Sequence, residues 1–135
     1  MPAPLRIIRR ARAAAAVVCA CGIAYLAQAP GLAEAAPYLG VLAGAGAGSA
    51  FLAAARLWSG GHLDGRIIAL SLSVAGLTGQ LLNVYAGLPG AGTLQGGLSG
   101  FGVLVAVLEL IILALLAVDA ARRSTAGVRR HPYAL

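Results

Sequence analysis

Four long apolar runs, separated by short polar segments, dominate the pattern of this 135-residue chain. They cover residues 11–29, 37–58, 67–88 and 101–118. A helix needs about 20 apolar residues to cross the hydrocarbon core of a bilayer, which is about 30 Å thick. The pattern therefore predicts an all-α integral membrane protein, an up-and-down bundle of four transmembrane helices. We expect this bundle to occupy residues 1–120 and a basic cytoplasmic tail to occupy residues 121–135.

The composition agrees with a membrane protein. Apolar residues make up 60% of the chain and charged residues only 10%, whereas an average soluble domain is about 25% charged. A net charge of +6 would also suit a nucleic-acid-binding protein. However, most of the arginines lie in two terminal clusters beside apolar runs. We therefore expect the lipid bilayer, and no nucleic acid, as the partner of these charges.

The arginines also predict the orientation of the helices, because cytoplasmic loops of membrane proteins are enriched in basic residues. They precede the first run, flank the loop between the second and third runs, and follow the fourth run. The two remaining loops contain no Lys or Arg. This alternation predicts a multi-pass protein of the cell membrane with both termini in the cytoplasm.

Residues near the helix ends are expected to contact the membrane interface. Trp58 is expected at the inner interface, and Tyr25, Tyr38 and Tyr85 near the outer helix ends, as in interfacial aromatic belts. Arginines beside the apolar runs attract anionic lipid headgroups. The residues expected to do so are Arg9, Arg10, Arg12, Arg122 and Arg123.

The N-terminal segment allows a second interpretation, a cleaved secretory signal. Basic residues, an apolar run and the tripeptide 27–29 (Ala-Gln-Ala) together resemble such a signal with its cleavage site. Cleavage would leave Pro30 at the new N-terminus, which suits signal peptidase poorly, and the apolar run is long for a signal. We therefore expect an uncleaved first helix.

Small and polar residues line one face of the second and of the third predicted helix. Gly40, Gly44 and Gly48 recur every four residues, which places them on one face of the second helix. The third helix carries a stripe with spacings of three and four, formed by Ser73, Gly76, Gln80, Asn83 and Gly87. Small residues allow close helix packing in bilayers, and amide side chains hydrogen-bond between helices. Both faces are predicted to pack against helices of this chain or of a partner.

Glu109 is the one charged residue in the middle of an apolar run. Counting from the outer helix ends places Glu109, Gln80, Ala45 and Cys21 at one depth. Burial in a bilayer favours the neutral form of a carboxyl group. Glu109, with Gln80 and Asn83, is therefore a candidate intramembrane polar site that carries a proton or a cation. Alternatively, Glu109 hydrogen-bonds Gln80 or a partner subunit and only holds helices together.

The sequence contains no arrangement of residues that indicates catalysis, and we expect no enzyme, no cofactor and no bound metal. The leading hypothesis is a structural or accessory membrane protein that associates with itself or with a membrane-protein partner through its glycine-rich and polar helix faces. One alternative is a small homo-oligomeric transporter or proton-coupled carrier that uses Glu109. A third is a holin-like pore-forming protein.

Overall fold

The computed structural model describes residues 3–60, 63–90 and 100–128. These residues form four α-helices and no strand: α1 (Ala3–Ala35), α2 (Pro37–Trp58), α3 (Leu63–Tyr85) and α4 (Gly100–Val128). Each helix is long and apolar enough to cross a membrane. The predicted all-α class and the predicted number of long apolar helices are therefore confirmed.

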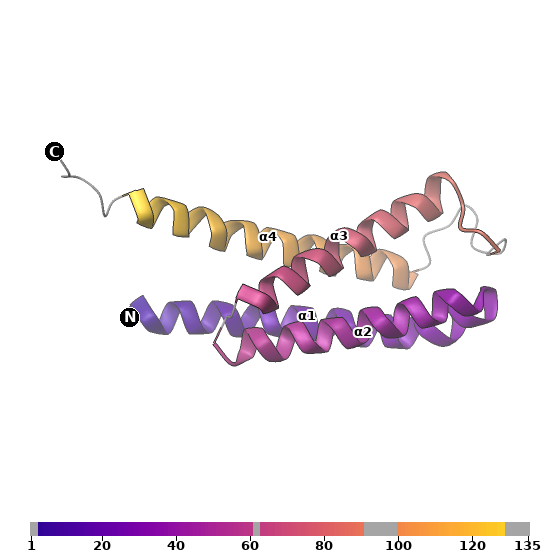
Figure 1. The fold of residues 1–135 in the computed structure, drawn as a ribbon, viewed down its shortest axis with the longest axis horizontal. Coiled ribbons are helices and arrows are strands. Elements are labelled where there is room, and N and C mark those ends of the chain that lie inside the picture. Colours follow the sequence, from indigo (N-terminus) through magenta and orange to yellow (C-terminus); the bar gives the residue numbers. More distant parts are fainter. Residues whose placement is uncertain (1–2, 61–62, 91–99, 129–135) are drawn as a thin grey trace.

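Successive helices run in opposite directions (Figure 1). α1 and α2 lie side by side as a hairpin, while α3 crosses them at a marked angle and α4 returns along α1 and α3 (Figure 1). The start of α1, the turn between α2 and α3 and the last part of α4 therefore gather at one end of the molecule. This end carries the described arginines of all four helices, and we refer to it as the basic end.

The boundary between α1 and α2 is set by a proline rather than by hydrophobicity. α1 continues through Pro30 to Ala35 and is longer than the predicted span of 11–29. Ala36 is extended, with φ −157° and ψ 124°, and Pro37 begins α2. A residue before proline is disfavoured in the helical conformation, whereas proline fits the first position of a helix. The chain therefore leaves one helix and enters the next within two residues.

The ends of α3 and α4 also differ from the predicted ones. α3 ends at Tyr85 rather than at residue 88. Gly87 lies past this end with φ +70°, a left-handed conformation in which glycine commonly terminates helices. The prediction that Gly87 belongs to the helix-packing stripe is therefore wrong. α4 continues to Val128, so the first residues of the predicted tail are helical, and residues 129–135 lie outside the described part of the chain.

α2 packs against α1 through an alanine face. The buried residues along this face of α2 recur every three or four positions: Leu39, Ala43, Ala47, Ala50, Ala54 and Leu57. Ala50, Ala54 and Leu57 belong to the main core together with Ala15, Val18, Cys21 and Ala24 of α1. A Cβ atom added to Gly22 would lie 3.0 Å from the Cβ of Ala50. Small residues on both sides thus allow the two helices to approach closely.

The predicted glycine face of α2 is only partly used within the chain. A Cβ added to Gly40 would lie 2.5 Å from the Cβ of Ala33 on α1. Gly44 and Gly48 are exposed, and within the described part of the chain a Cβ added to either would meet no atom within 4 Å. The close contact between α1 and α2 therefore depends on Gly40 and the alanine face, and Gly44 and Gly48 stay open.

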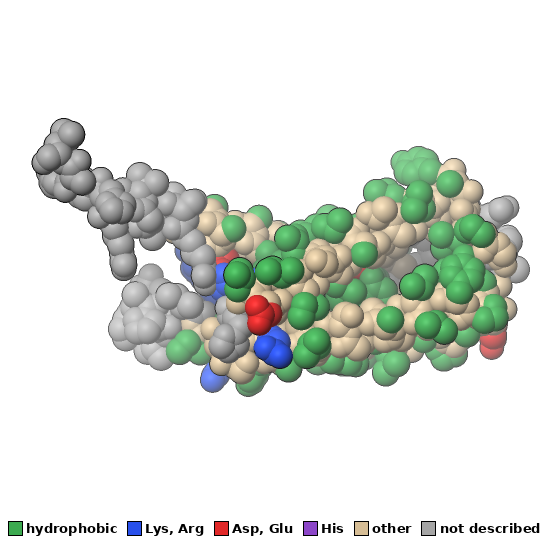
Figure 2. Space-filling view, in the orientation of Figure 1, with side chains coloured by type: hydrophobic (Ala, Val, Ile, Leu, Met, Phe, Trp, Pro, Cys, Tyr) green, Lys and Arg blue, Asp and Glu red, His purple; other side chains and the backbone are tan. Residues whose placement is uncertain are grey.

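The outer surface of the bundle is strongly apolar. Large aliphatic side chains point outward from all four helices, and Val41 on α2 is 71% exposed. Figure 2 shows apolar side chains along the length of one face, with charged side chains concentrated near the basic end. Soluble monomers rarely expose apolar patches of more than a few hundred Å². An apolar surface of this kind, like the lengths of the helices, suits contact with the hydrocarbon core of a bilayer.

Candidate functional site

Glu109 lies in the interior of the bundle. Its side chain is fully buried, and Val105 and Ile112, four residues before it and three after it on α4, are buried as well. Both neighbours belong to the main apolar core. The helical spacing therefore directs the carboxyl group of Glu109 into the core.

Tyr25 of α1 is the hydrogen-bonding partner of Glu109. Its hydroxyl group donates a hydrogen bond to Oε1 of Glu109. Tyr25 does not lie near a helix end, as the sequence predicted, because α1 continues ten residues beyond it to Ala35. The structure does not contain the alternative bond between Glu109 and Gln80, since Oε1 of Glu109 is bonded by Tyr25, and Oε2 of Glu109 and Oε1 of Gln80 both lack a hydrogen-bond partner among the described residues.

Gly76 of α3 provides the space for this pair. A Cβ added to Gly76 would overlap Oε1 of Glu109 and the hydroxyl oxygen of Tyr25, and would lie 2.6 Å from Cδ of Glu109. These separations are far shorter than ordinary van der Waals contacts. Only glycine at this position lets the backbone of α3 approach the carboxyl group so closely.

All four helices meet around the pair. Gly46 of α2 faces the ring of Tyr25, since a Cβ on Gly46 would lie 3.6 Å from Cδ1 of the tyrosine. Glu109, Tyr25, Gly76 and Gly46 each lie nine or ten residues from the helix end opposite the basic end. At 1.5 Å per residue this is about 14 Å, roughly half the thickness of a bilayer core. The shared level includes Glu109 as predicted, but Tyr25, Gly76 and Gly46 take the places expected for Cys21, Gln80 and Ala45.

A line of polar side chains extends from this pair along α3. Ser73, Gly76, Gln80 and Asn83 share one face of the helix, as their spacing predicted. Within the described part of the chain, four buried side-chain oxygens on this line or beside it have no hydrogen-bond partner: Ser73 Oγ, Gln80 Oε1, Asn83 Oδ1 and Glu109 Oε2. Such oxygens can accept hydrogen bonds or bind a cation or a proton.

The basic end is held by interactions between helices. Arg66 of α3 and Asp119 of α4 form an ion pair with an N–O distance of 2.6 Å, and both side chains are largely shielded. The guanidinium of Arg12 lies 5.4 Å from the ring centre of Trp58, which joins α1 to α2. Arg123 is also expected to contact lipid, but its side chain is not among those that the structure describes.

The described residues bring together no group of three or more His, Cys, Asp or Glu side chains that could hold a metal ion. The chain was compared with models of protein families, with curated proteins and with solved structures, and none of them matched. The chemistry of the site therefore has to be inferred from its geometry.

Proposed function

We propose that the chain is a small multi-pass protein of the cell membrane with a structural or accessory role, and that it associates through the open glycine face of α2. The observation that carries this proposal is that Gly44 and Gly48 are exposed, and that a Cβ added to either would meet no atom of the described residues within 4 Å. Each glycine in a helix costs about 1 kcal/mol relative to alanine. Close packing of a second helix against this face would offset that cost.

Membrane insertion is supported by the apolar surface and by four helices of sufficient length. The arginines of the basic end support a cytoplasmic location for both termini, in keeping with the positive-inside rule. We further propose that α1 is retained in the mature protein. Cleavage after Ala29 would remove Tyr25, which is the hydrogen-bonding partner of Glu109.

The structural role also accounts for Glu109. Its hydrogen bond with Tyr25 joins α1 to α4, and Gly76 brings α3 against the same pair. Hydrogen bonds between transmembrane helices contribute about 0.6–2 kcal/mol each. A single buried carboxyl group can thus hold three helices in one arrangement without any transport activity.

The test is purification from the native membrane in mild detergent, followed by native mass determination. We expect the wild-type chain to carry a stoichiometric partner subunit or a second copy of itself. Gly44→Ile and Gly48→Ile place a branched side chain on the open face and should abolish this complex. Gly79→Ile on α3 is the matched control, because a Cβ at Gly79 also has no atom of the described residues within 4 Å.

A wild-type chain that purifies as a bare monomer would contradict the proposal. The same holds if Gly44→Ile and Gly48→Ile assemble like the wild type, because the α2 face would then have no role in association.

The four unpartnered oxygens favour a second candidate function, a proton-coupled carrier. Glu109 would take up and release the proton, and Gln80 and Asn83 would provide polar contacts between it and the opposite end of the bundle. Glu109→Gln can still accept a hydrogen bond from Tyr25 but cannot exchange a proton. In proteoliposomes with an internal pH-sensitive dye, a carrier should lose its proton flux in this variant. Wild-type vesicles without proton flux would rule out this candidate.

A further inference from the structure

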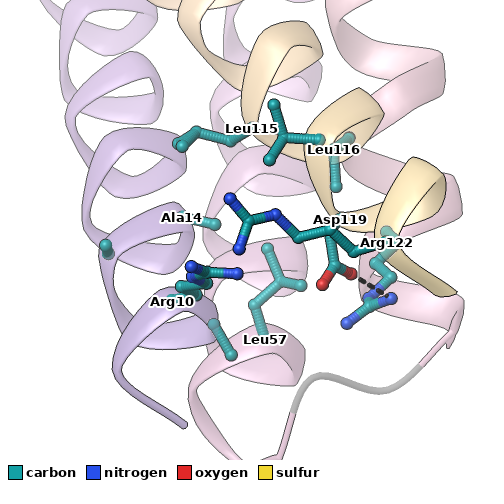
Figure 3. A pocket seen from close by; sticks show the side chains of 11 residues that line it. Arg10, Ala14, Leu57, Leu115, Leu116, Asp119 and Arg122 are labelled. Carbon is teal, nitrogen blue, oxygen red and sulfur yellow. Dashed lines mark ion pairs between the residues drawn. The ribbon is translucent and has the colours of Figure 1, made fainter. Parts of the chain in front are cut away.

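A pocket of about 180 Å³ opens at the basic end of the bundle. Three helices each contribute one arginine to its wall: Arg10 from α1, Arg66 from α3 and Arg122 from α4. Figure 3 shows the guanidinium groups of Arg10 and Arg122 reaching toward one another across the pocket, with Asp119 beside them. The pocket thus concentrates positive charge between helices that are far apart in sequence.

The residues that line this pocket carry more positive than negative charge. Asp119 is the one acidic residue among the residues that line it, and its carboxylate pairs with Arg66. Three guanidinium groups and one carboxylate leave two net positive charges. Arginine presents planar pairs of N–H donors that match the oxygens of a phosphate group. The charge and the donor type therefore indicate an anionic ligand with a phosphate group.

The remaining wall of the pocket is apolar. Ala14, Leu57, Leu115 and Leu116 line it around the arginines, with Leu115 and Leu116 on the side drawn above them (Figure 3). A free phosphate ion would gain nothing from this wall, whereas an amphiphile would place its acyl chain against it. Basic pockets between transmembrane helices on the cytoplasmic side are suited to anionic lipid headgroups.

We propose that this pocket binds the phosphate headgroup of an anionic phospholipid, with the acyl chain lying along Leu115 and Leu116. The inference rests on the proposed membrane location of the chain, but not on association through α2. It distinguishes Arg10 and Arg122, which line the pocket, from Arg12, which lies over Trp58 instead.

The experiment is native mass spectrometry of the full chain in neutral detergent, titrated with phosphatidylglycerol or with phosphatidylcholine. We expect phosphatidylglycerol to bind more tightly. Arg10→Gln or Arg122→Gln should weaken its binding about fivefold, the effect of one basic residue near an anionic headgroup. Arg12→Gln, a matched loss of one charge on α1, should change it less than twofold.

Equal binding of the two lipids would overturn the proposal. Equal losses in Arg10→Gln and Arg12→Gln would do so too, because they would indicate a diffuse surface attraction rather than a pocket. Displacement of the lipid by inorganic phosphate at similar concentration would make a soluble anion the ligand. Flotation of the wild-type chain with vesicles separately tests the membrane location, so failure of that proposal would be recognised independently.

Discussion

Gly76→Ala is expected to destabilise the bundle by about 3 kcal/mol, because the new methyl group would occupy the space of the Tyr25–Glu109 pair. Overpacking of a buried site costs about 1–3 kcal/mol, and loss of the hydrogen bond between helices would add about 1 kcal/mol. The carboxyl group of Glu109 is fully buried and bonded on one side, so it cannot move away freely. The measurement is the free energy of unfolding in detergent micelles, titrated with sodium dodecyl sulfate.

Gly79→Ala is the matched control for this prediction. It makes the same chemical change one turn further along α3, where an added Cβ meets no atom within 4 Å among the residues that the structure describes. Alanine is the better helix former by about 1 kcal/mol, so this variant should be as stable as the wild type or more stable. Equal stabilities of Gly76→Ala and Gly79→Ala would contradict the close approach of α3 to the pair.

Tyr25→Phe is expected to lower the free energy of unfolding by about 1–2 kcal/mol. The substitution keeps the ring against Gly46 but removes the hydroxyl group that donates to Glu109. Both carboxyl oxygens of Glu109 would then be buried without a partner from this chain, and an orphaned buried polar group costs about 1–3 kcal/mol.

Tyr38→Phe serves as the comparison for Tyr25→Phe. The hydroxyl group of Tyr38 donates a 2.7 Å hydrogen bond to the carbonyl oxygen of Pro89, but in an exposed position at the end of the bundle. Water can replace that bond, so the loss should be below about 0.5 kcal/mol. If the two phenylalanine variants are equally stable, the Tyr25 hydroxyl group does not contribute a buried hydrogen bond.

The number and approximate positions of the helices could be predicted because each apolar run is close to the length of a membrane-spanning helix. Helix ends were less predictable, since hydrophobicity marks the apolar stretch and not the hydrogen-bonded helix. α1 shows this clearly, because it continues through Pro30 until Pro37 forces Ala36 into an extended conformation.

The predicted end of α1 at residue 29 is also the reason why the sequence does not identify Tyr25 as the partner of Glu109. A helix that ends at residue 29 places Tyr25 near an interface and leaves Gln80 as the hydrogen-bonding candidate at the depth of Glu109. Once α1 extends to Ala35, Tyr25 lies at the depth of Glu109 and Gly76. The inward direction of the α3 stripe was predictable, because polar and small residues were spaced on one face.

The packing face of α2 could not be identified from spacing alone. Glycines at 40, 44 and 48 form a regular face, but alanines such as Ala43, Ala47 and Ala50 form another with similar periodicity. Both kinds of residue permit close helix approach. The choice depends on the shape of α1, where Gly22 lies close to Ala50 of the alanine face. The spacing of residues within α2 therefore does not show which of its two small-residue faces packs against α1.

The most direct test of the bundle's central contact is a double-mutant cycle between Tyr25 and Glu109. Tyr25→Phe and Glu109→Leu each leave one buried polar group without its partner, whereas the double variant leaves neither. The double variant should therefore be more stable than the sum of the single effects implies, by about 1 kcal/mol or more. Additivity within about 0.3 kcal/mol would contradict a direct contact between the two side chains.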